Sequence, residues 1–400
     1  MISLKERKRI LGAGKLKTVW EGEPLLGSIY SEEEIEAAVS VMRVAQEDVT
    51  KGFGYSKPTE DFEREFAAYA GTKHAIALNS AGPGLDLAMR FLKLKRGDEV
   101  IVPAINFVAA PLAVLGAGGQ VVWGEVNPKT LQLDPRDVEK RITPRTRAIF
   151  PVHFNGLSAP VDEYLDIARR NPHKRHGPPA VITDAARAVG GEYRGTKIGK
   201  KGLMTVFSFH TMKNMVTLGE GGMVTTDDDD AGAYVRSARF YGGATEVWGS
   251  SYVMTKVQAA VGSVQLKKLD GFIAARRRLA QARNGMLADV PGLQLPHEPK
   301  DCKHSYYLYT CLVPKAWAGE KRDRLMQMMS EVYGVKCLVA NPPCYKSRKL
   351  LRDHTAGQDL PLSNEIGARL LCLPIHPAMP DKDNEYISAA FIECMEQLRK

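Results

Sequence analysis

The amino-acid sequence predicts an α/β fold with a mainly parallel central sheet and helices on both of its faces. Short apolar segments alternate with helical patterns through the first two-thirds of the chain. Most of these segments are almost continuously apolar, which is typical of strands that helices cover on both sides. The chain has 400 residues, of which 44% are hydrophobic and 25% are charged. This length exceeds one typical domain, so we expect a large domain and a smaller one with a sizeable core.

Six segments are expected to form the strands of this sheet. After the first of them, Leu85, Ala88, Met89 and Leu92 recur at the spacing of one helix face. Residues 100–124 carry no charge over a length close to that of a membrane span. Proline and glycine residues interrupt this stretch, so it predicts a buried strand, a short helix and a second strand. The six strand segments are 74–79, 99–104, 120–126, 148–154, 180–186 and 205–210.

The composition changes after a long helical pattern over residues 257–278, which is rich in lysine and arginine. Beyond it the connections are rich in proline, and the last segment places apolar residues on one face of a closing helix. We therefore divide the chain into an N-terminal segment of residues 1–40 that packs with the small domain, a large domain of residues 41–269, and a small α+β domain of residues 270–400.

Cysteine usage and the first residues indicate a cytoplasmic protein without a membrane partner. All six cysteines lie between Cys302 and Cys394, with no C-x-x-C pair. This pattern argues against a zinc ribbon or a disulfide scaffold and favours reduced thiols, so we expect no metal site. The first 15 residues are charged and contain no apolar stretch that could serve as a signal peptide.

The net charge of +9 requires a test of nucleic-acid binding. The runs 276–278 and 267–268 lie on helical patterns without interleaved aromatic residues, and no nucleic-acid-binding signature is present. We interpret both runs as solvated helix faces and expect no nucleic-acid partner. The sequence also lacks a G-x-G-x-x-G fingerprint and a P-loop.

Four strand ends carry residues suited to a ligand, and in open α/β sheets ligands bind beyond the carboxyl ends of the strands. Residues 79–84 join a strand to a helix, where free N–H groups can hold a phosphate. Phe107 follows the second strand, Asp184 ends the fifth, and Ser208 and Lys213 end or follow the sixth. Pyridoxal phosphate (PLP) needs these groups: a lysine for the Schiff base, a carboxylate for the ring nitrogen, an aromatic face and phosphate donors.

The chain resembles the DegT/DnrJ/EryC1/StrS family of PLP-dependent aminotransferases, which act on keto-sugars and keto-cyclitols. The block VFSFHTMKNMVTLGEGGMV at 206–224 is very specific to the family. VITDAARAVGG at 181–191 is moderately specific, and GDEVIVPAINFVA at 97–109 also matches. The resemblance covers roughly residues 30 to 395. It implies a PLP-transferase fold of type I, in which the large domain binds the cofactor and the chain forms a homodimer with a shared active site.

The resemblance assigns the central roles to four side chains. Lys213 is expected to form the Schiff base and, once released by substrate, to move the 1,3-proton. Asp184 is expected to pair with the pyridine nitrogen of the cofactor, and Ser208 to bind its phosphate. Phe107 takes the position of the residue that stacks on the ring.

The remaining cofactor contacts depart from the family pattern. Ala81 and Gly82 are expected to offer backbone amides to the phosphate, but Pro83 removes one amide donor from this loop. Ser251 takes the position of the asparagine by which the neighbouring subunit completes the phosphate site. Arg187 replaces the usual glutamine or histidine. This arginine is expected beside the cofactor, where it either offsets lost phosphate contacts or binds a substrate carboxylate.

The resemblance implies an aminotransferase that moves an amino group from glutamate or glutamine to a keto-sugar, often nucleotide-linked, or to a keto-cyclitol. We expect a place in antibiotic, deoxysugar or cell-surface polysaccharide biosynthesis. One alternative is a PLP-dependent sugar dehydratase or another PLP enzyme that does not transaminate. Dehydratase relatives usually have histidine at the lysine position, so Lys213 favours transamination. Another alternative is a non-catalytic binding protein that retains the fold.

Overall fold

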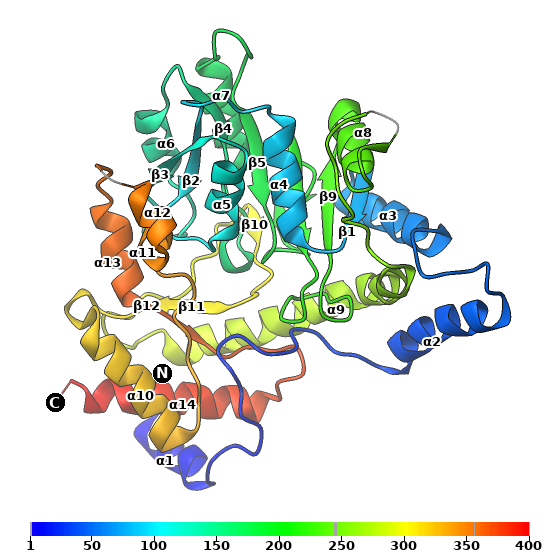
Figure 1. The fold of residues 1–400 in the computed structure, drawn as a ribbon. Coiled ribbons are helices and arrows are strands. Elements are labelled where there is room, and N and C mark those ends of the chain that lie inside the picture. The colour runs from blue at the N-terminus through cyan, green and yellow to red at the C-terminus, as the bar shows by residue number, and fades with distance from the viewer. Residues whose placement is uncertain (1, 244–245, 356, 400) are drawn as a thin grey trace.

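The computed structural model describes residues 2–243, 246–355 and 357–399. Its central feature is a seven-stranded sheet in the order β1-β9-β8-β5-β4-β2-β3 (Figure 1). Only β9 runs antiparallel to its neighbours within this sheet, so the predicted mainly parallel sheet is confirmed. The strands are β1 (His74–Leu78), β2 (Glu99–Pro103), β3 (Gln120–Gly124), β4 (Thr146–Ile149), β5 (Ala180–Asp184), β8 (Met204–Ser208) and β9 (Gly222–Thr226).

Each of the six predicted strand segments overlaps a strand, but two features differ from the prediction. The strand expected at 148–154 is β4, which ends at Ile149 because Pro151 and a 3-10 helix (Phe154–Gly156) follow it. The seventh strand, β9, was not predicted, since two glycines precede it and two threonines end it. Its insertion between β1 and β8 places the loop that carries Lys213 at the carboxyl edge of β8.

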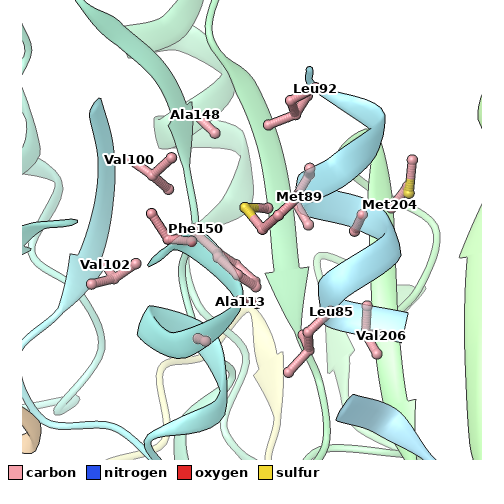
Figure 2. Packing of buried hydrophobic residues seen from close by; sticks show 14 of the residues in the cluster. Leu85, Met89, Leu92, Val100, Val102, Ala113, Ala148, Phe150, Met204 and Val206 are labelled. Carbon is pink, nitrogen blue, oxygen red and sulfur yellow. The ribbon is translucent and has the colours of Figure 1, made fainter. Parts of the chain in front are cut away.

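Helices cover both faces of the sheet, as predicted. On one face, Leu85 and Met89 of α4 and Leu92 just after it lie in one buried cluster with Phe150 and Val206 (Figure 2). Alternate strand residues belong to opposite faces: Ile76 and Leu78 lie in this cluster, whereas Ala75 and Ala77 pack with α3 and α9. The covering helices are α3 (Lys57–Ala70), α4 (Ala81–Phe91), α5 (Ala109–Gly116), α6 (Pro135–Arg141), α7 (Val161–Arg170), α8 (Asp229–Ala238) and α9 (Lys256–Leu287).

The uncharged stretch at 100–124 forms the buried unit β2, α5 and β3, as the sequence predicts. In this unit Val100 and Val102 lie within the core, and α5 packs against both strands. Within the described residues, no helix has the length and apolar character needed to cross a bilayer.

The C-terminal part of the chain forms a second core around a two-stranded antiparallel sheet. The apolar face predicted for the closing helix is buried there, with Phe391 and Cys394 fully covered. Short pairs of residues form a further three-stranded sheet. The elements are β11 (Tyr309–Leu312), β12 (Leu370–Leu373), α10 (Glu320–Tyr333), α11 (Cys344–Ser347), α12 (Lys349–Asp353), α13 (Pro361–Arg369), α14 (Asp381–Gln397), a 3-10 helix (Lys315–Trp317), β6 (Glu192–Tyr193), β7 (Thr196–Lys197) and β10 (Cys302–Lys303).

The N-terminal segment contacts the C-terminal core. Helix α1 (Leu4–Gly12) packs on α14, and Arg7 pairs with Glu396 at 2.5 Å. Helix α2 (Glu32–Glu47) instead packs on α9. The 32-residue helix α9 runs without interruption through residues 269 and 270, where the sequence suggested a domain boundary. The division into three segments therefore stays a prediction.

One charged residue on α9 contradicts its predicted position. Arg276 was expected on a solvated face, yet its side chain is fully buried, while Arg278 of the same run is exposed. The Arg276 guanidinium donates to the carbonyl oxygens of Gly27 (2.6 Å), Ile375 (3.1 Å) and Tyr307 (3.3 Å). A buried guanidinium is retained because backbone carbonyls replace the water that it loses. Burial lowers the pKa of Arg276 to about 10.

Candidate functional site

A cavity of about 390 Å³ lies at the carboxyl ends of the central strands. Seven of the eight predicted site residues line it, from four different strand ends, whereas Ser251 does not. The clustering follows from the topology, because the parallel strands β2, β5 and β8 all end at the same edge of the sheet. The seven lining residues are Ala81, Gly82, Phe107, Asp184, Arg187, Ser208 and Lys213.

The start of α4 provides an anion-binding end to the cavity. Ser80 is the N-cap of this helix, and its Oγ accepts from the Gly82 N–H at 3.4 Å. The first N–H groups of a helix have no partner within it and carry a partial positive charge. Across the cavity, Ser208 Oγ accepts from the His210 N–H at 3.3 Å, which leaves its hydroxyl proton available. Both groups suit a phosphate.

Asp184 places a carboxylate at the end of β5. Its side chain is buried, and Oδ1 accepts from the Ala186 N–H at 2.8 Å. Burial raises the pKa of Asp184, because the charged form loses its hydration. The Ala186 N–H, Lys213 and Arg187 oppose that shift and favour the carboxylate. A cationic ring nitrogen facing this group would favour the carboxylate further.

Lys213 lies on the loop between β8 and β9. Its backbone N–H donates to the His210 carbonyl at 2.8 Å, and its Nζ donates to the Tyr307 hydroxyl at 3.1 Å. Burial lowers the pKa of Lys213 to about 7, and the neighbouring Arg187 adds to that shift. An amine with a pKa of about 7 is about half deprotonated at pH 7, and its neutral form is competent to attack a carbonyl carbon.

Arg187 is held by two acceptors in the cavity wall. One guanidinium nitrogen donates to Asn155 Oδ1 at 3.0 Å, and another lies 3.7 Å from Glu23 Oε1. The guanidinium carbon lies 5.3 Å from the ring centre of Tyr307. The arginine is thus a fixed positive charge beside Lys213.

Phe107 and Ser251 are the two predicted residues with exposed side chains. Phe107 lines the cavity and is 55% exposed, so one face of its ring is free to stack on a ligand. Ser251 is exposed and forms an isolated bridge with Phe240, away from the cavity of its own chain. Its contribution to a neighbouring subunit stays a prediction.

Two residues that hydrogen bonds connect to Lys213 were not found by sequence reasoning. Glu23, from the N-terminal segment, lines the cavity, and it accepts a hydrogen bond from Tyr307, which follows β10. Glu23 lies in a stretch with no strand or helix pattern, so nothing in the sequence marks it. Tyr307 belongs to the aromatic stretch 306–309, which the sequence marks only as apolar.

The lining also holds an unpartnered polar group. Asn106 follows β2 and is 3% exposed; its Oδ1 accepts from the Phe107 N–H, while its Nδ2 has no partner. A buried amide donor without a partner is costly unless a ligand accepts from it. The polar groups that line the cavity are therefore an amine, a carboxylate, an unpaired amide N–H and the N–H groups at a helix start. This set fits a planar aldehyde that carries a ring nitrogen, a ring hydroxyl and a phosphate, which are the groups of PLP.

Comparison with known proteins agrees with this chemistry. A model of the DegT/DnrJ/EryC1/StrS aminotransferase family matches residues 31–392. GDP-perosamine synthase of Caulobacter vibrioides is 35% identical over 339 residues, which are 82% of this chain and 88% of that protein. The spore coat polysaccharide biosynthesis protein SpsC of Bacillus subtilis is 33% identical over 341 residues, with 81% and 86% coverage.

The same likeness holds in three dimensions. The crystal structure of DesV from Streptomyces venezuelae superimposes with a TM-score of 0.82 at 34% identity, covering 91% of this chain and 95% of that one. The predicted α/β fold of the PLP-transferase type is thereby confirmed. The family match over most of the chain, together with these relatives, shows that the protein is a transaminase of the DegT/DnrJ/EryC1/StrS aminotransferase family.

Proposed function

We propose that this protein is a PLP-dependent aminotransferase that transfers an amino group from glutamate or glutamine to a nucleotide-linked keto-sugar. The observation that carries the proposal is the buried Lys213 amine, which shares one cavity with the Asp184 carboxylate and the start of α4. Two relatives support the acceptor class, because their names specify a GDP-linked and a dTDP-linked amino sugar. Products of this kind serve deoxysugar, antibiotic and cell-surface polysaccharide biosynthesis. A keto-cyclitol is the second acceptor class.

Each residue of the cavity has a place in this reaction. When bound, PLP supplies an aldehyde and a ring that withdraws electrons from the substrate carbon. Lys213 Nζ would bind the aldehyde and, once free, take a proton from the substrate carbon and return it elsewhere. Asp184 would hold the proton on the ring nitrogen. The N–H groups of Ala81 and Gly82, with Ser208, would bind the phosphate.

The first test is covalent capture of the cofactor. The purified chain should absorb near 400–430 nm, and borohydride should bleach that band and fix the cofactor on the Lys213 peptide, as read by mass spectrometry. Lys213→Ala should remain colourless and inactive, whereas Lys349→Ala, on the exposed side of α12, should behave as the parent. Capture at another lysine would refute the assignment.

The second test separates transamination from dehydration. With a nucleotide-linked keto-sugar and ¹⁵N-labelled amino donor, the product should gain one labelled nitrogen. Loss of water without nitrogen would identify a dehydratase instead. Replacement of the sugar by a keto-cyclitol in the same assay ranks the two acceptor classes by kcat/KM.

We also place Ser251 in the active site of a second copy of the chain. Ser251 is exposed, and three large aromatic residues near it are more than half exposed: Phe240, Tyr241 and Trp248. Exposed apolar patches of this kind mark interaction surfaces. Sedimentation analysis should give a homodimer, and Trp248→Glu should produce monomers that bind PLP more weakly. The six free cysteines are consistent with a reducing, cytoplasmic location.

A further inference from the structure

A chain of hydrogen bonds connects Lys213 to the carboxylate of Glu23, which belongs to the N-terminal segment. Lys213 Nζ donates to the Tyr307 hydroxyl at 3.1 Å, and that hydroxyl donates to Glu23 Oε1. The same Oε1 lies 3.7 Å from the Arg187 guanidinium. We propose that Glu23 and Tyr307 are positioning residues, which hold the free Lys213 amine and stabilise the proton that it takes from substrate. This inference rests on the proposed function.

The direction of each hydrogen bond in this chain is fixed by burial and charge. Tyr307 is fully buried, and burial raises its pKa, so the phenol keeps its proton at neutral pH. Burial favours the neutral form of Glu23, but Arg187, the Tyr307 hydroxyl and Lys213 outweigh it, and the pKa of this carboxyl is lowered. Glu23 is therefore an anion at neutral pH. The phenol keeps its one proton in the hydrogen bond that it donates to Glu23, so toward Lys213 its oxygen can only accept.

The charges that face Lys213 come from several elements. Glu23 on the N-terminal segment, Asp184 on β5 and Glu220 before β9 favour its ammonium form, whereas Arg187 opposes it. His210, on the same loop as Lys213, also faces Glu23. Among these groups, Glu23 is the anion that a hydrogen-bonded side chain links to Nζ. Its removal should therefore act on Lys213 both through charge and through the orientation of Tyr307.

The N-terminal strap, residues 20–30, fixes the place of Glu23. Gly27 N–H donates to the Thr211 carbonyl at 2.8 Å, and the Gly27 carbonyl accepts from Arg276. On the other side of Glu23, Gly22 lies so close to Leu338 that a Cβ would stand 2.6 Å from its side chain. On one side of Glu23 the strap thus contacts the Lys213 loop, and on the other side it contacts Leu338 in the C-terminal part of the chain.

The chemical consequence concerns the proton that moves during catalysis. When the amine takes a proton from the substrate carbon, a positive charge appears on Nζ inside a buried cavity. The Tyr307 oxygen and the Glu23 anion stabilise that charge, and neither Tyr307 nor Glu23 gains or loses a proton. Without them the ammonium would be less stable, so proton abstraction would slow while substrate binding would change little.

The test measures the protonation of Lys213 directly, in the full chain after PLP is removed with hydroxylamine. Trace labelling with acetic anhydride at a series of pH values, read by mass spectrometry of the Lys213 peptide, gives the midpoint of amine deprotonation. Glu23→Gln should move the midpoint down by about 1 pH unit, since removal of a nearby opposite charge disfavours the ammonium form. Glu23→Asp, which keeps the charge, should restore part of the shift.

Two further variants keep the test falsifiable. Tyr307→Phe should lower the midpoint by a smaller amount than Glu23→Gln, because it removes only the hydrogen bond. Glu21→Gln removes a carboxylate of the same strap that pairs with Lys336 at 2.7 Å, outside the cavity, and should leave the midpoint unchanged. In the enzyme reloaded with PLP, Glu23→Gln should lower kcat more than it changes KM.

An unchanged midpoint in both Glu23→Gln and Tyr307→Phe, with normal circular dichroism, would overturn the positioning role. Failure of the proposed function has a different signature. In that case borohydride would fix no cofactor on Lys213, although the labelling midpoint would still respond to Glu23. Borohydride capture therefore tests the proposed function, and the labelling midpoint separately tests the positioning role of Glu23 and Tyr307.

Discussion

Burial favours the neutral form of both Lys213 and Asp184 and shifts the pKa of each accordingly. Burial lowers the pKa of the amine and raises the pKa of the carboxyl, because each ion loses its hydration in the cavity. The neutral amine is the reactive form for imine formation. For the carboxyl, a cation beside it favours the ionised form, and the proposed ring nitrogen would be such a cation.

Asp184→Asn tests the carboxylate at this scale. The amide keeps the shape but cannot hold a proton on a ring nitrogen, so we expect kcat to fall by about 10²- to 10³-fold. PLP should still be fixed on Lys213 by borohydride. Asp353→Asn, which alters an exposed carboxylate on α12, serves as the control. Steady-state kinetics with a saturating amino donor provides the measurement, and a fall of less than threefold would contradict the role.

Arg187→Gln tests the positive charge next to Lys213. Arg187 is the charged neighbour that lowers the pKa of this amine, so its removal should raise the midpoint of Lys213 labelling above about pH 7. The sign is opposite to that expected for Glu23→Gln. A rise in the KM for the amino donor alone would assign Arg187 to binding of a substrate carboxylate, whereas weaker PLP binding would assign it to the phosphate.

At the scale of elements, the strap depends on a close approach between backbones. A Cβ at Gly27 would lie 2.0 Å from the Met212 carbonyl oxygen and 2.3 Å from that of Lys213. Both obstacles are main-chain atoms of the Lys213 loop, so they cannot turn aside as a side chain would. Glycine at this position therefore allows the strap to lie against the loop.

Gly27→Ala should separate the strap from the loop. We expect the free energy of unfolding to fall by about 1–3 kcal/mol, the usual cost of overpacking. The hydrogen bond from Tyr307 to Glu23 should weaken at the same time. Gly285→Ala, inside α9 with open space around it, should be neutral or slightly stabilising. Urea unfolding of both variants gives the comparison, and equal stabilities would refute the steric argument.

The sequence was informative where local pattern determines structure. Apolar segments between turns identified the six strands, and strand ends in a parallel sheet identified the residues that converge on the cavity. Strand β9 was missed because threonine and glycine weaken its apolar signal. Glu23 and Tyr307 were missed for another reason: they are 284 residues apart, and Tyr307 is 94 residues from Lys213. Residues so far apart in the sequence come together only through tertiary packing, so no local sequence pattern predicts their contact.

At the scale of the whole molecule, buried histidines make the fold sensitive to acid. Burial lowers the pKa of His153 and of His304 to about 3 in each case. Both rings have a nitrogen that accepts from a backbone N–H, so they are held neutral. The unfolded chain would bind protons on these rings below about pH 6.5, whereas the folded chain would not until about pH 3. Stability should thus fall as the pH drops through this window.

His304→Asn should flatten this dependence. Asparagine can still accept from the Tyr306 N–H but does not titrate. Between pH 8 and pH 5 the parent should lose about 2 kcal/mol more free energy of unfolding than the variant, at about 1.4 kcal/mol per pH unit below the ordinary histidine pKa. Urea unfolding at both pH values measures this difference. His354→Asn, at an exposed position, should follow the parent.

The uninterrupted α9 joins the side of the molecule that holds the cavity to the C-terminal core. Arg276 within this helix of 32 residues donates hydrogen bonds to carbonyl oxygens of the strap, of Tyr307 and of the segment before α14. A protease cut at residues 269–270 would leave Glu23 and Lys213 on one fragment, and Arg276 and Tyr307, which contact the strap, on the other. Fragments 2–269 and 270–399 should fail to reassemble into an active enzyme when they are mixed.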